Sequence, residues 1–128
     1  MQDYRDIKVW QKAHQLTLDV YAATAGFPPE ERFGLTSQMR RAAVSIAANI
    51  VEGRARQADG DFGRFLSIAL GSASELEYLL LLARDLNYTE TEQYGPMADE
   101  IDQVKRMLAT FVRRLAAERS TKTLKAES

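Results

Sequence analysis

The sequence predicts an all-α protein, an up-down-up-down antiparallel four-helix bundle, and two observations carry this prediction. Apolar residues recur at spacings of three and four along four separate segments, which is typical of helices that bury one face. The links between these segments are short and polar, as they are between antiparallel neighbours in a bundle. No segment keeps the alternation of a β-strand, and 128 residues suit a single domain.

The first helix is expected from about Asp6 to Thr24. It ends at Gly26, because Pro28 and Pro29 cannot continue a helix. At helical spacing its apolar face consists of Val9, Trp10, Ala13, Leu16, Thr17, Val20 and Tyr21.

The second helix is expected to begin near Thr36 or Ser37, since either hydroxyl can accept a hydrogen bond from the first-turn amides. It runs to about Arg54. Glu52 and Gly53 mark its end, where glycine can take a positive φ.

The third helix is expected from about Asp61 to Asn87, with the aspartate at its start. A short polar turn with one glycine separates it from the second helix. Its predicted core face consists of Phe62, Phe65, Ala69, Ala73, Leu76, Leu80 and Ala83.

The fourth helix is expected after Tyr88, where Thr89 and Glu92 have the spacing of a capping box. Gly95-Pro96 predicts a kink, or a short separate turn before the main helix, because an internal proline loses a backbone bond. The apolar stripe has heptad-like spacing and consists of Tyr94, Met97, Ile101, Val104, Leu108, Phe111 and Leu115.

Beyond Ala117 the sequence is polar and shows no periodic pattern, so a frayed or mobile end is expected there. The predicted organisation is therefore a bundle domain over residues 1–117 and a polar C-terminal tail over residues 118–128.

The second and third helices carry more apolar residues than one core face needs. A helix that is apolar on two sides is expected to pack twice, once in its own bundle and once against a neighbour, for which a second copy is the simplest candidate. The alternative is a scatter of single surface aliphatics. The residues expected at an oligomer interface are Val44, Ala48, Val51, Leu70, Tyr78, Leu81 and Leu82.

Polar residues of the same two helices allow two interpretations. In an antiparallel hairpin with its turn near residues 57–58, residues whose numbers sum to about 115 lie level. This rule places Arg40 or Arg41 near Glu75, where an ion pair would set the register, and Asn49 near Leu66. We favour such structural contacts over a ligand site for the set Arg40, Arg41, Asn49, Glu52 and Glu75.

The net charge of −1 argues against an obvious nucleic-acid binder, but the charge is unevenly distributed. From Val104 to the C-terminus basic residues outnumber acidic ones. This bias is either a basic patch for RNA or DNA or the solvated end of a helix, where cations suit the helix dipole. The candidate nucleic-acid-binding residues are Lys105, Arg106, Arg113 and Arg114.

Catalytic, metal and cofactor sites find no support, and no enzyme activity is expected. His14 is the only histidine and there is no cysteine, so the usual zinc ligand sets cannot form. No Glu-x-x-His pair, phosphate-binding loop or serine with a histidine partner is present. The longest apolar run, residues 78–83, is far shorter than a membrane span of about 18 residues. A cytoplasmic protein that contacts no membrane is expected.

Three blocks in order carry a family resemblance: DIKVWQKA, FGLTSQMRRAAVSIAANIVEG and FLSIALGSASELE. Together they resemble the bacterial four-helix bundle family also called 23S rRNA intervening-sequence proteins, over roughly residues 4–117. This family has no assigned enzymatic activity. It is related to the accessory variability proteins of diversity-generating retroelements, which form pentameric barrels that bind a reverse transcriptase and RNA.

The resemblance implies a four-helix bundle, a homopentamer, and RNA or a nucleic-acid-associated protein as a partner. The retroelement proteins are strongly basic, whereas this chain is slightly acidic. The expected function is that of a non-enzymatic oligomeric assembly protein, and the alternative is an RNA- or DNA-binding ring that uses the basic C-terminal helix.

Overall fold

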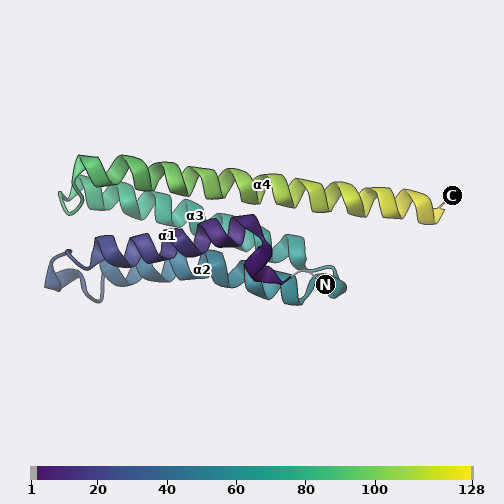
Figure 1. The fold of residues 1–128 in the computed structure, drawn as a ribbon, viewed down its shortest axis with the longest axis horizontal. Coiled ribbons are helices and arrows are strands. Elements are labelled where there is room, and N and C mark those ends of the chain that lie inside the picture. The colour runs from purple at the N-terminus through teal and green to yellow at the C-terminus, as the bar shows by residue number, and fades with distance from the viewer. Residues whose placement is uncertain (1–2, 128) are drawn as a thin grey trace.

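A computed structural model describes residues 3–127 and contains four long helices joined by short links (Figure 1). Three short 3₁₀ turns lie outside them, at Tyr4–Asp6, Pro29–Glu31 and Gln57–Asp59. Within the described part of the chain there is no strand. The helices are α1 (Lys8–Thr24), α2 (Leu35–Ala55), α3 (Phe62–Asp85) and α4 (Thr91–Glu127).

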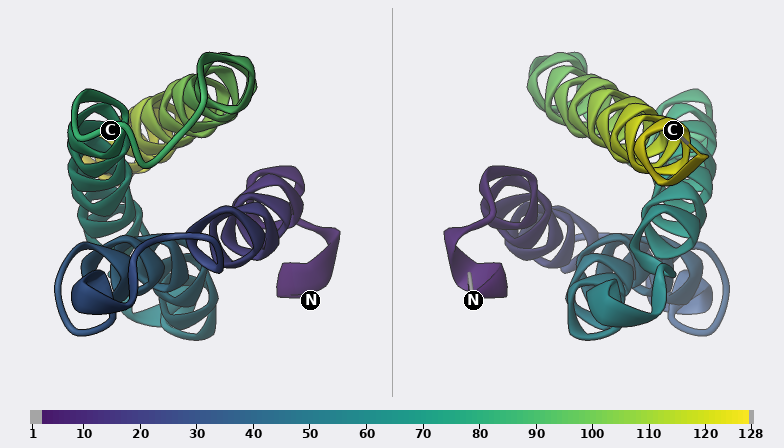
Figure 2. Two further views of the ribbon diagram at one scale, coloured as in Figure 1. Left: turned by 90° about the vertical axis from the view of Figure 1, so that its left-hand side faces the viewer. Right: turned by 90° about the vertical axis from the view of Figure 1, so that its right-hand side faces the viewer.

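The helices run alternately up and down, as the sequence predicts, and follow one another around the bundle axis (Figure 2). Each of α2 and α3 therefore lies between two neighbours. The α2–α3 contact is the most extensive, and the α1–α4 contact is the smallest between adjacent helices. The bundle is thus tightest at its central hairpin and loosest along the seam between its first and last helices.

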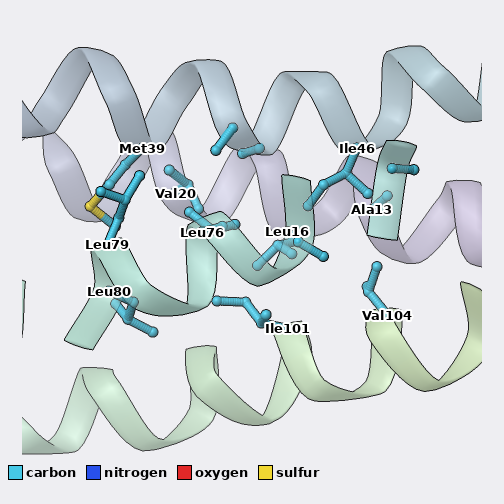
Figure 3. Close-up of a cluster of buried hydrophobic side chains, with 14 of the residues drawn as sticks. Ala13, Leu16, Val20, Met39, Ile46, Leu76, Leu79, Leu80, Ile101 and Val104 are labelled. Atoms are coloured by element: carbon cyan, nitrogen blue, oxygen red, sulfur yellow. The ribbon is translucent and has the colours of Figure 1, made fainter. Parts of the chain in front are cut away.

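The core follows the predicted apolar spacing. Every helix contributes large aliphatic side chains to one buried cluster (Figure 3). In α4 the centre of the predicted stripe is buried, whereas Tyr94, Phe111 and Leu115 are half-buried. The largest fully buried side chains are Leu16, Val20, Met39, Ile46, Ile50, Leu66, Leu76, Leu80, Ile101, Val104 and Leu108.

The buried face of α3 is wider than predicted. The structure adds Leu66 and Leu79 to the core and leaves Phe65 half-buried beneath the guanidinium groups of Arg56 and Arg64. The reason is that α3 packs against both α2 and α4, so its buried arc is broader than one stripe. Part of its apolar excess is therefore used inside the bundle.

By length and composition, α3 is the one helix among the described residues that could cross a membrane, with a mean hydropathy of 1.5 over its best window. The central helix of a helical bundle passes the same test. Since α3 lies between α2 and α4 and supplies much of the core, its composition is accounted for by its place in the fold.

Two predicted helix caps are wrong. Thr36 lies inside α2, and the Glu31 carboxylate instead accepts a hydrogen bond of 3.2 Å from the amide of Leu35, the first helical residue. Thr89 does not cap α4, because Tyr88 packs on Phe27 and bonds to Glu31, and the adjacent Thr89 is drawn into the interior. Its hydroxyl has no hydrogen-bond partner among residues 3–127.

The ends of two helices also differ from expectation. Gly53 does not end α2 but is buried within it, and the glycine with positive φ is Gly60, after the following 3₁₀ turn. The third helix ends at Asp85, two residues early, because Asn87 takes a left-handed conformation with φ of 64°.

Pro96 does not interrupt α4, which begins at Thr91 and shows no break in Figure 1. The proline is exposed in the second turn of the helix, where water can satisfy the carbonyl that it leaves without a partner. The expected frayed tail is also wrong, since α4 continues as one helix to Glu127. Residues 118–126 are all exposed, so the tail adds nothing to the core.

Candidate functional site

The outer surface of the α2–α3 hairpin holds most of the candidate residues. The serine hydroxyls of Ser45 on α2 and Ser72 on α3 lie 2.8 Å apart and set these helices level at this point. Their numbers sum to nearly the predicted value, so the register deduced from the sequence is confirmed. Asn49 extends the contact along α2, donating to the Ser45 carbonyl at 2.8 Å and its hydroxyl at 3.0 Å.

Arg40 faces α1, not α3. Its Nε donates to the Thr24 hydroxyl at 2.8 Å, and a terminal nitrogen donates to the Tyr21 carbonyl at 3.3 Å. The guanidinium lies 4.5 Å from the centre of the Tyr21 ring. The predicted contact of Arg40 with Glu75 is therefore wrong, because its position on α2 directs the side chain to the other neighbouring helix.

Arg41 and Glu75 line a common surface hollow of about 390 Å³ between α2 and α3, with Ser45 and Ser72 on its walls. Both charged residues are exposed. Arg41 therefore lies near Glu75 as predicted, but within residues 3–127 neither side chain makes an ion pair, so the expected ionic contact is not formed. The hydroxyl contact sets the register instead.

A second hollow, of about 450 Å³, continues the first across α2 towards α1. Arg41 and Ser45 line both hollows, so they form one uneven surface that reaches from Tyr21 to Glu75. We call this the hairpin surface. Its residues are Tyr21, Gln38, Arg40, Arg41, Ala42, Val44, Ser45, Ser72 and Glu75.

The predicted interface residues separate into two groups. Val44 and Tyr78 are exposed, at 43% and 59% of their surface, and Ala48 is exposed as well. Leu70 and Leu82 pack partly against the core of their own bundle, and Val51 and Leu81 are half-buried. Ile68, which is 42% exposed on α3, was not predicted as an interface residue, although its position six residues beyond Phe62, about one and two-thirds turns, places it off the core face.

Glu52, also predicted in this group, forms an ion pair with Arg56 one turn later on the same helix, at 3.0 Å. It does not line either hollow. The five predicted polar residues thus have different environments. Arg40 contacts α1, whereas Asn49 and Glu52 bond to residues of α2 itself. Arg41 and Glu75 are exposed charges without an ion pair among residues 3–127.

The four candidate basic residues of α4 do not all lie at one site, although Arg106 and Arg114 border the same groove. Lys105 pairs with Glu77 of α3 at 3.2 Å, and Arg106 pairs with Asp102 at 2.8 Å. Arg113 donates to the Thr110 hydroxyl at 3.2 Å. Arg114 borders a groove of about 530 Å³ between the start of α1 and α4, whose other cations are Lys8 and Arg106.

The seam between α1 and α4 contains two neighbouring carboxyl groups, Asp19 and Glu100, whose pairing was not predicted from the sequence. Burial, a hydrogen bond with Asp19 and the negative charge of Asp19 raise the pKa of Glu100 to about 7, although Lys12 opposes the shift. Gln15 donates to the Asp19 carboxylate at 3.0 Å. No motif within either helix indicates this pair, because the contact depends on how α1 packs against α4.

The described residues bring no cluster of metal-ligating side chains together around His14. His14 is exposed and stacks on Trp10, with ring centres 5.0 Å apart and planes inclined by 7°. Among the residues that the structure describes, no three His, Cys, Asp or Glu side chains come together as possible metal ligands. The paired serines of the hairpin contact each other and not a histidine.

Comparisons with known proteins agree on one family. A crystal structure of a protein of unknown function from the S23 ribosomal protein family of Bacteroides thetaiotaomicron is 28% identical to this chain, with a TM-score of 0.72. The match covers 81% of this chain and 97% of that one. No curated protein matches the sequence. The family model of the 23S rRNA-intervening sequence proteins matches residues 5–110, and the chain belongs to this family.

Proposed function

We propose that this protein is a non-enzymatic assembly unit of the cytoplasm, which associates with copies of itself through the hairpin surface. The observation that carries the proposal is the exposure of Val44 on the hairpin surface, and of Tyr78 one turn beyond its Glu75, beside the open charges of Arg41 and Glu75. Exposed apolar groups next to unpaired charges are typical of a surface that another protein covers. The family resemblance implies five copies.

The test is the native mass, measured by light scattering on a sizing column at micromolar concentration. Wild-type protein is expected to elute as several chains. Val44→Glu should weaken association at least about tenfold, since a charge would then be buried at the contact. A monomeric wild type would contradict the proposal.

Leu124→Glu is the matched control, because Leu124 is 67% exposed on the α4 tail, away from the hairpin surface. It should leave the mass unchanged. Circular dichroism of both variants should show wild-type helicity, because neither position lies in the core. Loss of helicity in Val44→Glu alone would show that this residue supports the bundle itself, and would count against its role at an interface.

A second candidate function, RNA binding, is favoured by the shape of α4. The helix runs past the rest of the bundle (Figure 1), and its exposed end carries Arg119, Lys122 and Lys125 against Glu118. Cations on a protruding helix can contact phosphates without sequence preference. A labelled 23S rRNA fragment should then bind in low salt, with an affinity that falls as salt rises. Absent or salt-independent binding would exclude this candidate.

A further inference from the structure

The seam between α1 and α4 leaves a groove that the bundle does not fill. These helices border the open side of the bundle in both end-on views (Figure 2), and their contact is the smallest between adjacent helices. The groove has a volume of about 530 Å³ and lies between the start of α1 and the middle of α4. We call it the seam groove.

The floor of the seam groove is apolar. Ile7 and Val9, at the start of α1, are buried, and Met107 and Phe111 of α4 are half-buried against the core. A partner that covers the remaining surface of these side chains removes apolar area from water, which favours binding. The groove therefore offers a partner more than charge alone.

The rim of the seam groove is positively charged. Lys8, Arg106 and Arg114 are exposed there, against one acidic residue, Asp6. Arg106 pairs with Asp102, whereas among residues 3–127 neither Lys8 nor Arg114 makes an ion pair. The rim is thus complementary to a partner that carries negative charge.

The spacing along α4 suits a partner that is itself a helix. Arg106 and Arg114 are eight residues apart, which corresponds to about 12 Å along the helix axis, and Met107 and Phe111 lie between them. A partner helix completes about two turns over this length. It can therefore place apolar side chains three and four residues apart on the floor and a carboxylate beside each arginine. An extended peptide turns every second side chain away and covers less of the floor.

RNA fits the seam groove less well. Phe111 already packs edge-on against Phe62, with ring centres 5.1 Å apart, so less of its ring is left for a stacked base. The aliphatic side chains of the floor cannot form hydrogen bonds with base edges, and Asp6 at the rim repels phosphates. These features favour a protein partner.

We propose that the seam groove binds an acidic amphipathic helix of another protein, with the apolar face of that helix on the floor and its carboxylates beside Lys8, Arg106 and Arg114. This goes beyond the proposed self-association. The seam groove shares no lining residue with the hairpin surface, so a partner can bind whether or not copies of the chain associate.

A labelled synthetic peptide tests the site. The peptide has about 14 residues, enough for a short helix, with leucines at spacings of three and four and a glutamate at each end of that stripe. Fluorescence anisotropy should give a Kd in the micromolar range that rises with salt. The same peptide with lysines in place of the glutamates should bind at least about tenfold more weakly.

Charge reversal in the protein assigns the binding to the seam groove. Arg114→Glu should weaken binding of the acidic peptide at least about tenfold and should strengthen binding of the lysine peptide, which a loss of structure would not do. Met107→Gln should also weaken binding of the acidic peptide, because it makes the floor polar. Arg113→Glu is the matched control, since Arg113 is exposed on α4 beside Arg114 but does not line the groove.

Circular dichroism should show that all three variants retain their helices. Failure of wild type to bind the acidic peptide, equal binding of the two peptides, or equal losses in Arg113→Glu and Arg114→Glu would overturn the proposal. A labelled oligouridine that binds in place of the peptide, and binds Arg114→Glu more weakly, would overturn it in favour of RNA. None of these results depends on the native mass, so this proposal and the proposed self-association can fail separately.

Discussion

Gly53 lies at a close approach between α2 and α3. A Cβ atom added there would be 2.8 Å from the Cβ of Phe65, 2.9 Å from a ring carbon of Phe62 and 3.3 Å from its carbonyl oxygen. These atoms belong to, or lie close to, the backbone of α3, so the helices themselves would have to move. The glycine is required by packing at this point and not by its freedom to take a positive φ.

Gly53→Ala should lower the free energy of unfolding by about 1–3 kcal/mol, the usual cost of forcing an extra group into a packed contact. Gly71→Ala is the matched control. Gly71 is also inside a helix, but it is exposed and an added Cβ meets nothing within 4 Å. That change should stabilise the protein by up to about 1 kcal/mol through helix propensity. Urea unfolding of both variants measures the two effects. Equal changes in the free energy of unfolding for Gly53→Ala and Gly71→Ala would contradict the close packing at Gly53.

Single-residue roles were only partly predictable from the sequence. The register of the hairpin follows from equal rise along two helices, and Ser45 and Ser72 confirm it. The choice between Arg40 and Arg41 depends on which neighbouring helix each side chain meets, and spacing along α2 does not give this. Thr89 shows the same dependence, because its place is set by Tyr88 packing on Phe27.

At the scale of helices, the seam between α1 and α4 differs from the other three contacts. It is the least extensive, and it holds the carboxyl groups of Asp19 and Glu100 side by side. Burial and the neighbouring acid make the protonated form of Glu100 the favoured one, which gives the raised pKa of about 7. The weakest contact of the bundle therefore contains a group that titrates near neutral pH.

The sign of the pH effect follows from this shift. The ordinary pKa of a glutamate is 4.5, so the folded state holds the Glu100 proton more tightly than the unfolded chain does. Its contribution to stability is complete below about pH 4.5 and is lost as the pH rises through about 7. The urea concentration at the unfolding midpoint of wild type should therefore decrease as the pH is raised from 5.5 to 8.

Glu100→Gln keeps a neutral side chain of similar size and should flatten that decline, so that the variant is the more stable protein at pH 8. Glu118→Gln, at an exposed position, should leave the decline unchanged. An equal decline in Glu100→Gln would show that the seam does not control it.

Helix existence was well predicted from the sequence, and helix ends were not. Spacings of three and four located all four helices, since burial of one face dominates their formation. The start of α2 depends on Glu31, which lies outside the helix, and the end of α3 depends on the left-handed turn at Asn87. The tail of α4 lacks any apolar pattern and is helical through continuity with the turns before it.

At the scale of the whole molecule, the question is which apolar faces the bundle leaves uncovered. The sequence shows more apolar residues on α2 and α3 than one core face needs, but it does not indicate which of them are buried within the bundle and which are exposed. Leu70 and Leu82 of α3 pack partly against the core, whereas Val44 of α2 and Tyr78 of α3 are exposed, although both helices lie between two neighbours. The direction in which each side chain leaves its helix relative to these neighbours decides its burial, and the periodicity of a single helix does not contain this information.

The last ten residues of the described chain form the protruding end of α4 (Figure 1). Their deletion tests whether this end contributes to the stability and the assembly of the bundle. Deleting the chain after Ala117 removes residues 118–126, all of which are exposed, including Arg119, Lys122 and Leu124. The free energy of unfolding should therefore change by less than about 1 kcal/mol, as for other surface changes.

The same truncation should leave the native mass unchanged, because the hairpin surface lies on α1, α2 and α3 and is intact. If the rRNA fragment binds the full chain, the slope of log affinity against log salt should shrink by about 0.7–0.9 for each phosphate contact that is lost. A truncated chain that becomes monomeric would place the α4 end in the assembly contact. An unchanged salt slope would indicate that the cations that bind RNA lie in the groove beside Lys8 and Arg114 and not at the α4 end.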